Sequence, residues 1–193
     1  MRTVFDVGAP EGAIVPRLLK LSNAIDLLNE KVGYICNLLV LLACLVSAAN
    51  AMSRYAFGLS SNAYLELQWY MFAILVMFGA SYTFKRNEHV RVEILYLMLS
   101  ERGQLWLDLI GTLFFLIPIC LLLCYLSWPF FQQSYATGEW SGNPGGLLRW
   151  PIKFVLPGGF AMLALQGLSE VIKRAAALFG KVTIDVTYER PMQ

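Results

Sequence analysis

Charged residues are scarce in this sequence. Only 15% of its 193 residues are charged, whereas a soluble domain typically carries about 25%. The net charge is +2 at pH 7 and no long basic run occurs, so the composition gives no sign of a nucleic-acid partner. With 58% hydrophobic residues, the chain is predicted to have lipid, rather than water, as its main solvent.

Histidine is almost absent, since His89 is the single one. A haem between helices usually needs two axial ligands and a zinc ion three or four, so neither cofactor is expected. Cys36, Cys44, Cys120 and Cys124 fall inside apolar stretches, unlike the loop cysteine pairs of thiol-oxidising membrane enzymes. The sequence therefore predicts no metal, no cofactor and no enzyme activity.

The apolar stretches have no ionisable residue near their centres. Glu66, Asp108 and Glu170 all lie near the ends of these stretches. A carrier that couples ions by itself is expected to bury such groups at the bilayer midplane. The pattern therefore favours a membrane framework over the polypeptide that moves a substrate.

Long apolar stretches dominate the chain, each close to the length of about 20 residues that a helix needs to cross a hydrocarbon core of about 30 Å. They predict an all-α membrane protein with four transmembrane helices and additional amphipathic interfacial helices. The predicted spans are residues 33–52, 65–84, 105–131 and 152–172. They lie in a membrane domain over 18–175, between an N-terminal tail over 1–17 and a C-terminal tail over 176–193.

The distribution of lysine and arginine predicts the orientation. Twelve of them lie before the first predicted span, between the second and third, or after the fourth, whereas Arg54, Arg149 and Lys153 lie in or next to the other two loops. Because positive charge is enriched on the cytoplasmic side, both termini are predicted to be cytoplasmic.

Two segments are predicted to be surface helices at the inner membrane face. Residues 18–32 carry an apolar stripe with helical spacing, formed by Leu18, Leu21, Ile25, Leu28 and Val32. An extension of the first span is the alternative for this segment. Residues 87–98 form the second candidate.

Prolines predict irregular points in the third and fourth spans. Pro118 predicts a bend in the third span, because it removes one backbone hydrogen bond. Pro151 suits the first turn of the fourth helix. Pro157 with the two glycines after it predicts a kink or a loosened turn.

Several local patterns occur in a fixed order. They are Asn50–Gly58 at the end of the first span, Glu66–Trp69 at the start of the second, Gly79–Ala80, His89–Glu93, Trp150–Lys153, Leu156–Phe160 and Leu165–Gln166. Together with the four spans, this order resembles the small membrane subunit of TRAP transporters, the tripartite ATP-independent periplasmic carriers. The family often has aspartate where Glu93 stands.

The resemblance implies a small, non-catalytic scaffold subunit of a sodium-coupled secondary transporter in the bacterial inner membrane. Such a transporter imports organic acids that a periplasmic binding protein delivers. The implied partners are a large multi-helix membrane subunit, which would hold the sodium and substrate sites, the periplasmic binding protein and membrane lipids. A stand-alone oligomeric channel or pump, or a membrane assembly factor, is the alternative.

Residues near the span ends are the candidate contacts to lipids or to these partners, because basic and aromatic side chains anchor helices at headgroup level. They are Arg54, Tyr55, Glu66, Trp69, His89, Arg91, Trp140, Arg149, Trp150 and Lys153. The three outward cations, Arg54, Arg149 and Lys153, are predicted either to hold lipid headgroups or to contact the binding protein.

Overall fold

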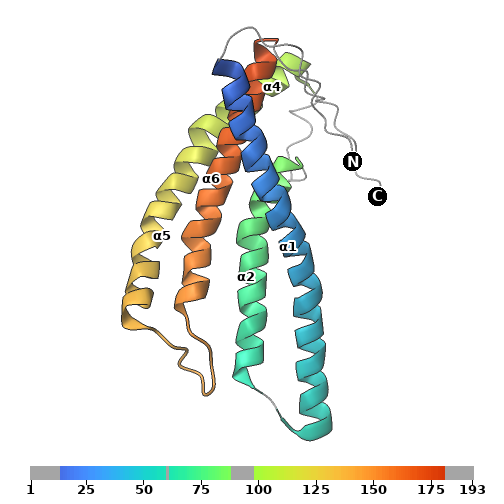
Figure 1. Cartoon of the computed structure of the whole chain (residues 1–193), viewed down its shortest axis with the longest axis vertical. Coiled ribbons are helices and arrows are strands. Elements are labelled where there is room, and N and C mark those ends of the chain that lie inside the picture. The colour runs from blue at the N-terminus through green and yellow to red at the C-terminus, as the bar shows by residue number, and fades with distance from the viewer. Residues whose placement is uncertain (1–13, 60, 88–97, 181–193) are drawn as a thin grey trace.

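The computed structural model describes residues 14–59, 61–87 and 98–180, most of which are helical (Figure 1). The elements are α1 (Ile14–Phe57), α2 (Asn62–Lys85), α4 (Glu101–Gly111), the π-helical turn η1 (Thr112–Leu116), α5 (Ile117–Thr137) and α6 (Trp150–Leu178). Within this described part, four helical segments are long and apolar enough to cross a membrane. The prediction of an all-α membrane protein with four transmembrane helices is confirmed.

Two surface helices are predicted from the sequence. The one over 87–98 lies almost entirely outside the described residues, and so do the candidate contact residues His89 and Arg91. Most of both predicted tails lies outside them too.

Helix α6 is the centre of the assembly. The helices α1, α2, α4 and α5 and the turn η1 all pack against it, and α1 also packs along α2 (Figure 1). In the most apolar 18-residue stretch of α6, 44% of the residues are buried, against 11–17% in the other three spans. The outer helices therefore turn broad apolar faces away from the chain, toward lipid or another membrane protein.

Helix α1 corrects the prediction of a surface helix over 18–32. That segment is the beginning of a continuous helix of 44 residues, about 66 Å long at 1.5 Å per residue. Its apolar stripe faces mostly outward, with Leu21 and Leu28 nearly half exposed, whereas Ser22 and Asn29 are fully buried. The polar face lies inside because the end of α6 offers it polar partners. The structure therefore shows the alternative prediction, in which residues 18–32 extend the first span.

The third span is irregular where Pro118 predicts it to be. Since Pro118 has no N–H to donate, the regular hydrogen-bond pattern cannot continue through it. The preceding residue, Ile117, donates its N–H to the carbonyl of Thr112, five residues back. The result is the π turn η1 between α4 and α5, a form that such irregularities often take.

The kink or loosened turn predicted at Pro157 does not end the helix, because α6 is helical from Trp150 to Leu178 with Pro157 inside it. Gly159 instead allows close contact with α2. A Cβ atom at this position would lie 2.7 Å from the Cβ of Met77 and 3.0 Å from its carbonyl oxygen. Small residues at such crossings let membrane helices approach closely. Pro151 lies in the first turn of α6, as predicted.

Candidate functional site

The ion pairs of the described residues lie at the two ends of the assembly. We call the end where α1 begins and α6 finishes the terminal end, and the end where α1 finishes and α6 begins the loop end (Figure 1).

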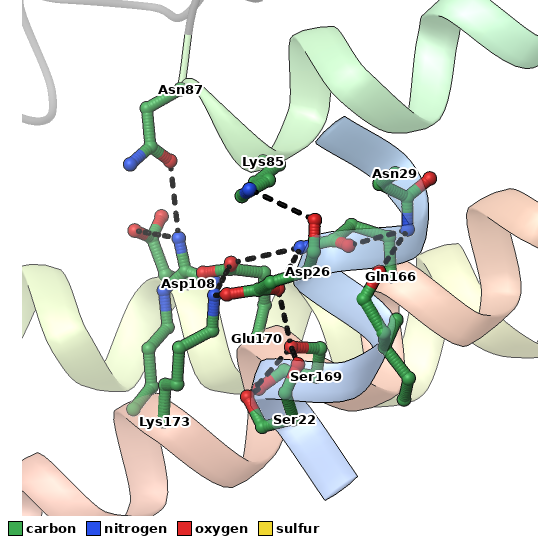
Figure 2. Close-up of polar contacts among 12 residues, drawn as sticks. Ser22, Asp26, Asn29, Lys85, Asn87, Asp108, Gln166, Ser169, Glu170 and Lys173 are labelled. Carbon is green, nitrogen blue, oxygen red and sulfur yellow. Dashed lines mark hydrogen bonds and ion pairs between the residues drawn. The ribbon is translucent and has the colours of Figure 1, made fainter. Parts of the chain in front are cut away.

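Asp26 on α1 is the hub of a buried polar network at the terminal end (Figure 2). Its carboxylate accepts hydrogen bonds from Lys173 Nζ at 2.9 Å, Ser169 Oγ at 2.8 Å and Gln166 Nε2 at 3.0 Å, all from α6. Lys173 also forms an ion pair with Glu170. One lysine therefore joins two carboxylates and ties the beginning of α1 to the end of α6.

Arg174 extends this terminal network to two further elements. Its guanidinium lies 2.8 Å from Glu170 and 3.3 Å from Asp108 on α4. It also donates to the Asn87 side chain, just after α2, at 3.3 Å. Lys85 of α2 donates to the backbone carbonyl of Asp26 at 2.9 Å. The network thus connects α1, α2, α4 and α6.

The charged members of the network are almost fully buried. Asp26, Glu170, Lys173 and Arg174 are only 5–8% exposed. A buried charge is costly unless it is paired and hydrogen-bonded, and each of these four has an oppositely charged partner. The arrangement therefore holds the helices in one fixed geometry.

The depth of the network follows from helix length. From Trp150 to Lys173, α6 rises about 35 Å at 1.5 Å per residue, so the charges lie near the terminal boundary of a hydrocarbon core of about 30 Å. Closer to the middle lie neutral groups, where Asn29 Nδ2 donates to Gln166 Oε1 at 2.8 Å. On α6, Glu170, Lys173 and Arg174 thus lie nearer the boundary and Gln166 lies deeper, while on α1 the Glu30 carboxylate pairs with Lys85 at about the depth of Asn29.

Sequence reasoning missed this network, although a signal was present. Ser22, Asp26 and Asn29 follow the spacing of one helical face on α1, and Gln166, Ser169 and Lys173 do so on α6. Within the described residues, no group of three or more His, Cys, Asp or Glu side chains is arranged to hold a metal ion.

At the loop end, Glu66 anchors the connection between α5 and α6, residues 138–149, which we call the long loop. The Glu66 carboxylate accepts hydrogen bonds from Ser141 Oγ, from Asn143 Nδ2 at 2.9 Å and from the Leu147 N–H at 2.6 Å. Gly146 permits this approach, since a Cβ there would lie 2.9 Å from a Glu66 oxygen. Glu66 is only 4% exposed, so its carboxylate is committed to the loop rather than presented on the surface.

Two of the predicted outward cations share one carboxylate at this end. Lys153 forms an ion pair with Glu139, and Arg149 Nη1 lies 3.8 Å from Glu139 Oε1. The hydrogen bond from Lys153 is the main cause that holds the pKa of Glu139 below its ordinary value of 4.5. Lys153 Nζ also lies 4.1 Å from the centre of the Phe130 ring.

The remaining candidates lie around the loop end. Tyr55 is 97% exposed in the last turn of α1, next to the exposed Arg54. Trp69 and Trp140 are 63% and 67% exposed. Trp150 is partly buried and packs edge-on against Tyr135. The structure thus brings Glu66, Trp69, Trp140, Arg149, Trp150 and Lys153 to one region, with Arg54 and Tyr55 at the same end on α1.

Comparison with known families gives one match. The model of the family described as tripartite ATP-independent periplasmic transporters, DctQ component, matches residues 42–177. Comparisons with curated proteins and with solved structures gave no match. The matched segment covers well over half of the chain, from about two-thirds of the way along α1 to the last turn of α6. The chain therefore belongs to the DctQ family, the small permease component of TRAP transporters.

Proposed function

We propose that this chain is the non-catalytic scaffold subunit of a sodium-coupled transporter that imports organic acids. Family membership supports a tripartite system in the inner membrane, with a large membrane subunit and a periplasmic binding protein as partners. In this proposal the large subunit holds the sodium and substrate sites, and the binding protein delivers the substrate.

The buried network at the terminal end is the observation that carries the scaffold role. Its ion pairs join α1, α4 and α6 directly, and Lys85 adds α2 through the Asp26 carbonyl. A buried pair whose partners are separated leaves an uncompensated charge, which costs several kcal/mol. Helices joined in this way resist sliding past one another, as a frame must when a neighbouring domain moves substrate.

The outward surfaces fit the same role. Each of α1, α2 and α5 exposes a row of large apolar side chains, and α5 adds Tyr125, 76% exposed near the middle of that helix. A tyrosine hydroxyl in hydrocarbon is costly without an acceptor. A neighbouring membrane protein would provide that acceptor and cover part of the apolar surface.

For orientation, we propose that the terminal end faces the cytoplasm and the loop end the periplasm. The excess of lysine and arginine on the terminal side supports this placement. Single cysteines placed at Ser61 and at Ser100 in a cysteine-free background would report it. A membrane-impermeant thiol reagent applied to spheroplasts, from which the outer membrane has been removed, should label the Ser61→Cys variant and not the Ser100→Cys variant.

Reconstitution tests the proposed division of labour. The tagged chain should co-purify with a much larger membrane protein, and sodium-driven uptake into liposomes should need both polypeptides and the binding protein. Liposomes with this chain alone should show no uptake. Substrate flux by this chain alone would contradict the proposal and favour a stand-alone channel or pump.

A further inference from the structure

A cleft of about 380 Å³ opens at the loop end between α2 and α5, which both pack on α6. Its walls are largely apolar. The apolar lining includes Tyr70, Ala73 and Met77 from α2, Phe130 from α5, and Val155 and Leu156 from α6. This volume lies within the range of about 300–1,000 Å³ that is typical of ligand sites.

The length of the cleft matches one leaflet of a bilayer. Along α2 its lining runs from Glu66 to Met77, a rise of about 16 Å at 1.5 Å per residue. Half of a hydrocarbon core of about 30 Å is about 15 Å. The cleft therefore extends from headgroup depth to about the middle of the membrane, the distance that one acyl chain covers.

Charged side chains line only the outer end of the cleft. Arg149 and Lys153 share the carboxylate of Glu139, and with the Glu66 carboxylate at the same end the four groups carry no net charge. The Arg149 side chain is 46% exposed, and its 3.8 Å separation from Glu139 is beyond hydrogen-bond distance. Glu66 also lies at this end, but its carboxylate already accepts three hydrogen bonds from the long loop. The guanidinium of Arg149 is thus placed to bind an added anion.

We propose that this cleft binds one phospholipid from the leaflet at the loop end, with its phosphate at Arg149 and Lys153 and an acyl chain along Ala73 and Met77. Trp69, which is 63% exposed, flanks the cleft at headgroup depth. An apolar helix of another protein would fill the walls but would leave the Arg149 guanidinium, 3.8 Å from Glu139, without a hydrogen-bonded anion. A phospholipid supplies the anion and the chain together, and the site depends only on membrane insertion, not on the scaffold role.

Photo-crosslinking of the detergent-purified protein, together with any companion subunit that co-purifies, tests the site. The probe is phosphatidylethanolamine with a photoactivatable acyl chain, titrated and then mapped by peptide mass spectrometry. Adducts should concentrate on residues 70–77 and 155–156. Ala73→Phe, which fills the cleft, should abolish them. Arg149→Gln should raise the half-saturating probe concentration about tenfold, as expected for one hydrogen bond to a charged group.

Two matched variants control for bulk and for charge. Val76→Phe adds the same ring to α2 at a position that is 61% exposed and outside the cleft lining, and Arg54→Gln removes a cation at the same end. Both should leave the adduct pattern unchanged. The proposal is overturned if adducts spread evenly over the outward faces, if Ala73→Phe leaves them in place, or if Arg54→Gln weakens them as much as Arg149→Gln. Lipid adducts found on a companion subunit, with none on the cleft residues, would also overturn it.

Discussion

Replacing Lys173 by methionine removes the cation that joins Asp26 to Glu170. Methionine keeps a similar length, so the volume of the side chain changes little while the charge is lost. Lys173 is 5% exposed, and its Nζ lies 2.9 Å from Asp26 Oδ2. After the substitution, Glu170 still has Arg174 as an ion-pair partner, whereas Asp26 loses its paired cation.

The size of the effect follows from burial. Breaking a buried pair by removing one partner costs about 3–5 kcal/mol. For a chain of this size, a loss of 1 kcal/mol in the free energy of unfolding lowers the melting temperature by about 2–4 °C. Lys173→Met should therefore lower the melting temperature by about 6–20 °C. Thermal unfolding in detergent can be followed with a thiol-reactive fluorophore, because the Cys36 and Cys120 side chains are buried in the folded protein. A Cys44→Ala background removes the signal of the exposed thiol.

Two further variants make this test specific. Lys31→Met removes an exposed lysine from α1 and should change the free energy of unfolding by less than about 0.5 kcal/mol. Adding Asp26→Asn to Lys173→Met should recover part of the loss, because a neutral amide needs no cation. If Lys173→Met is as mild as Lys31→Met, the network does not stabilise the helix assembly and the reasoning is refuted.

Three other predictions concern the loop end and the helix contacts. Glu66→Gln should increase hydrogen exchange in the long loop, because the charge that strengthens its three hydrogen bonds is lost; unchanged protection would mean that the carboxylate is not the anchor. Gly159→Ala should destabilise the protein by about 1–3 kcal/mol through its clash with Met77. The control is Gly111→Ala, since a Cβ there meets nothing within 4 Å, and it should be neutral or mildly stabilising in the same melting assay. The pKa of Glu139 is lowered on folding, so its contribution to stability is fully present above its ordinary value of 4.5 and is lost as pH falls through the lowered pKa. Melting curves between pH 7 and pH 3 should show this loss, and Glu139→Gln should reduce the dependence of the melting temperature on pH.

The spans could be predicted because the thickness of the bilayer imposes a length on each apolar stretch. The same reasoning could not give the full extent of α1, since its first part has too many polar residues to register as a span. An apolar stripe usually marks the buried face of a helix in water. In this membrane protein the rule is reversed at Asp26, where the polar face is buried and Leu21 faces outward.

Pairing between distant helices could not be predicted from one sequence. Asp26 and Lys173 lie 147 positions apart, and their contact depends on how α1 and α6 align in space. The hydrogen bonds between Glu66 and the long loop could not be predicted for the same reason. What could be predicted at the loop end was the grouping of basic and aromatic residues near span ends, which follows from the chemistry of the headgroup layer.

The central position of α6 has a consequence for biogenesis. The ribosome makes this helix after α1, α2, α4 and α5, yet all of them pack against it. Until it enters the bilayer, Asp26 has neither Lys173 nor Gln166 to meet. The buried ion pair between α1 and α6 therefore forms only after α6 has been synthesised and inserted, and an intermediate that holds α1, α2, α4 and α5 alone leaves the Asp26 carboxylate without these partners.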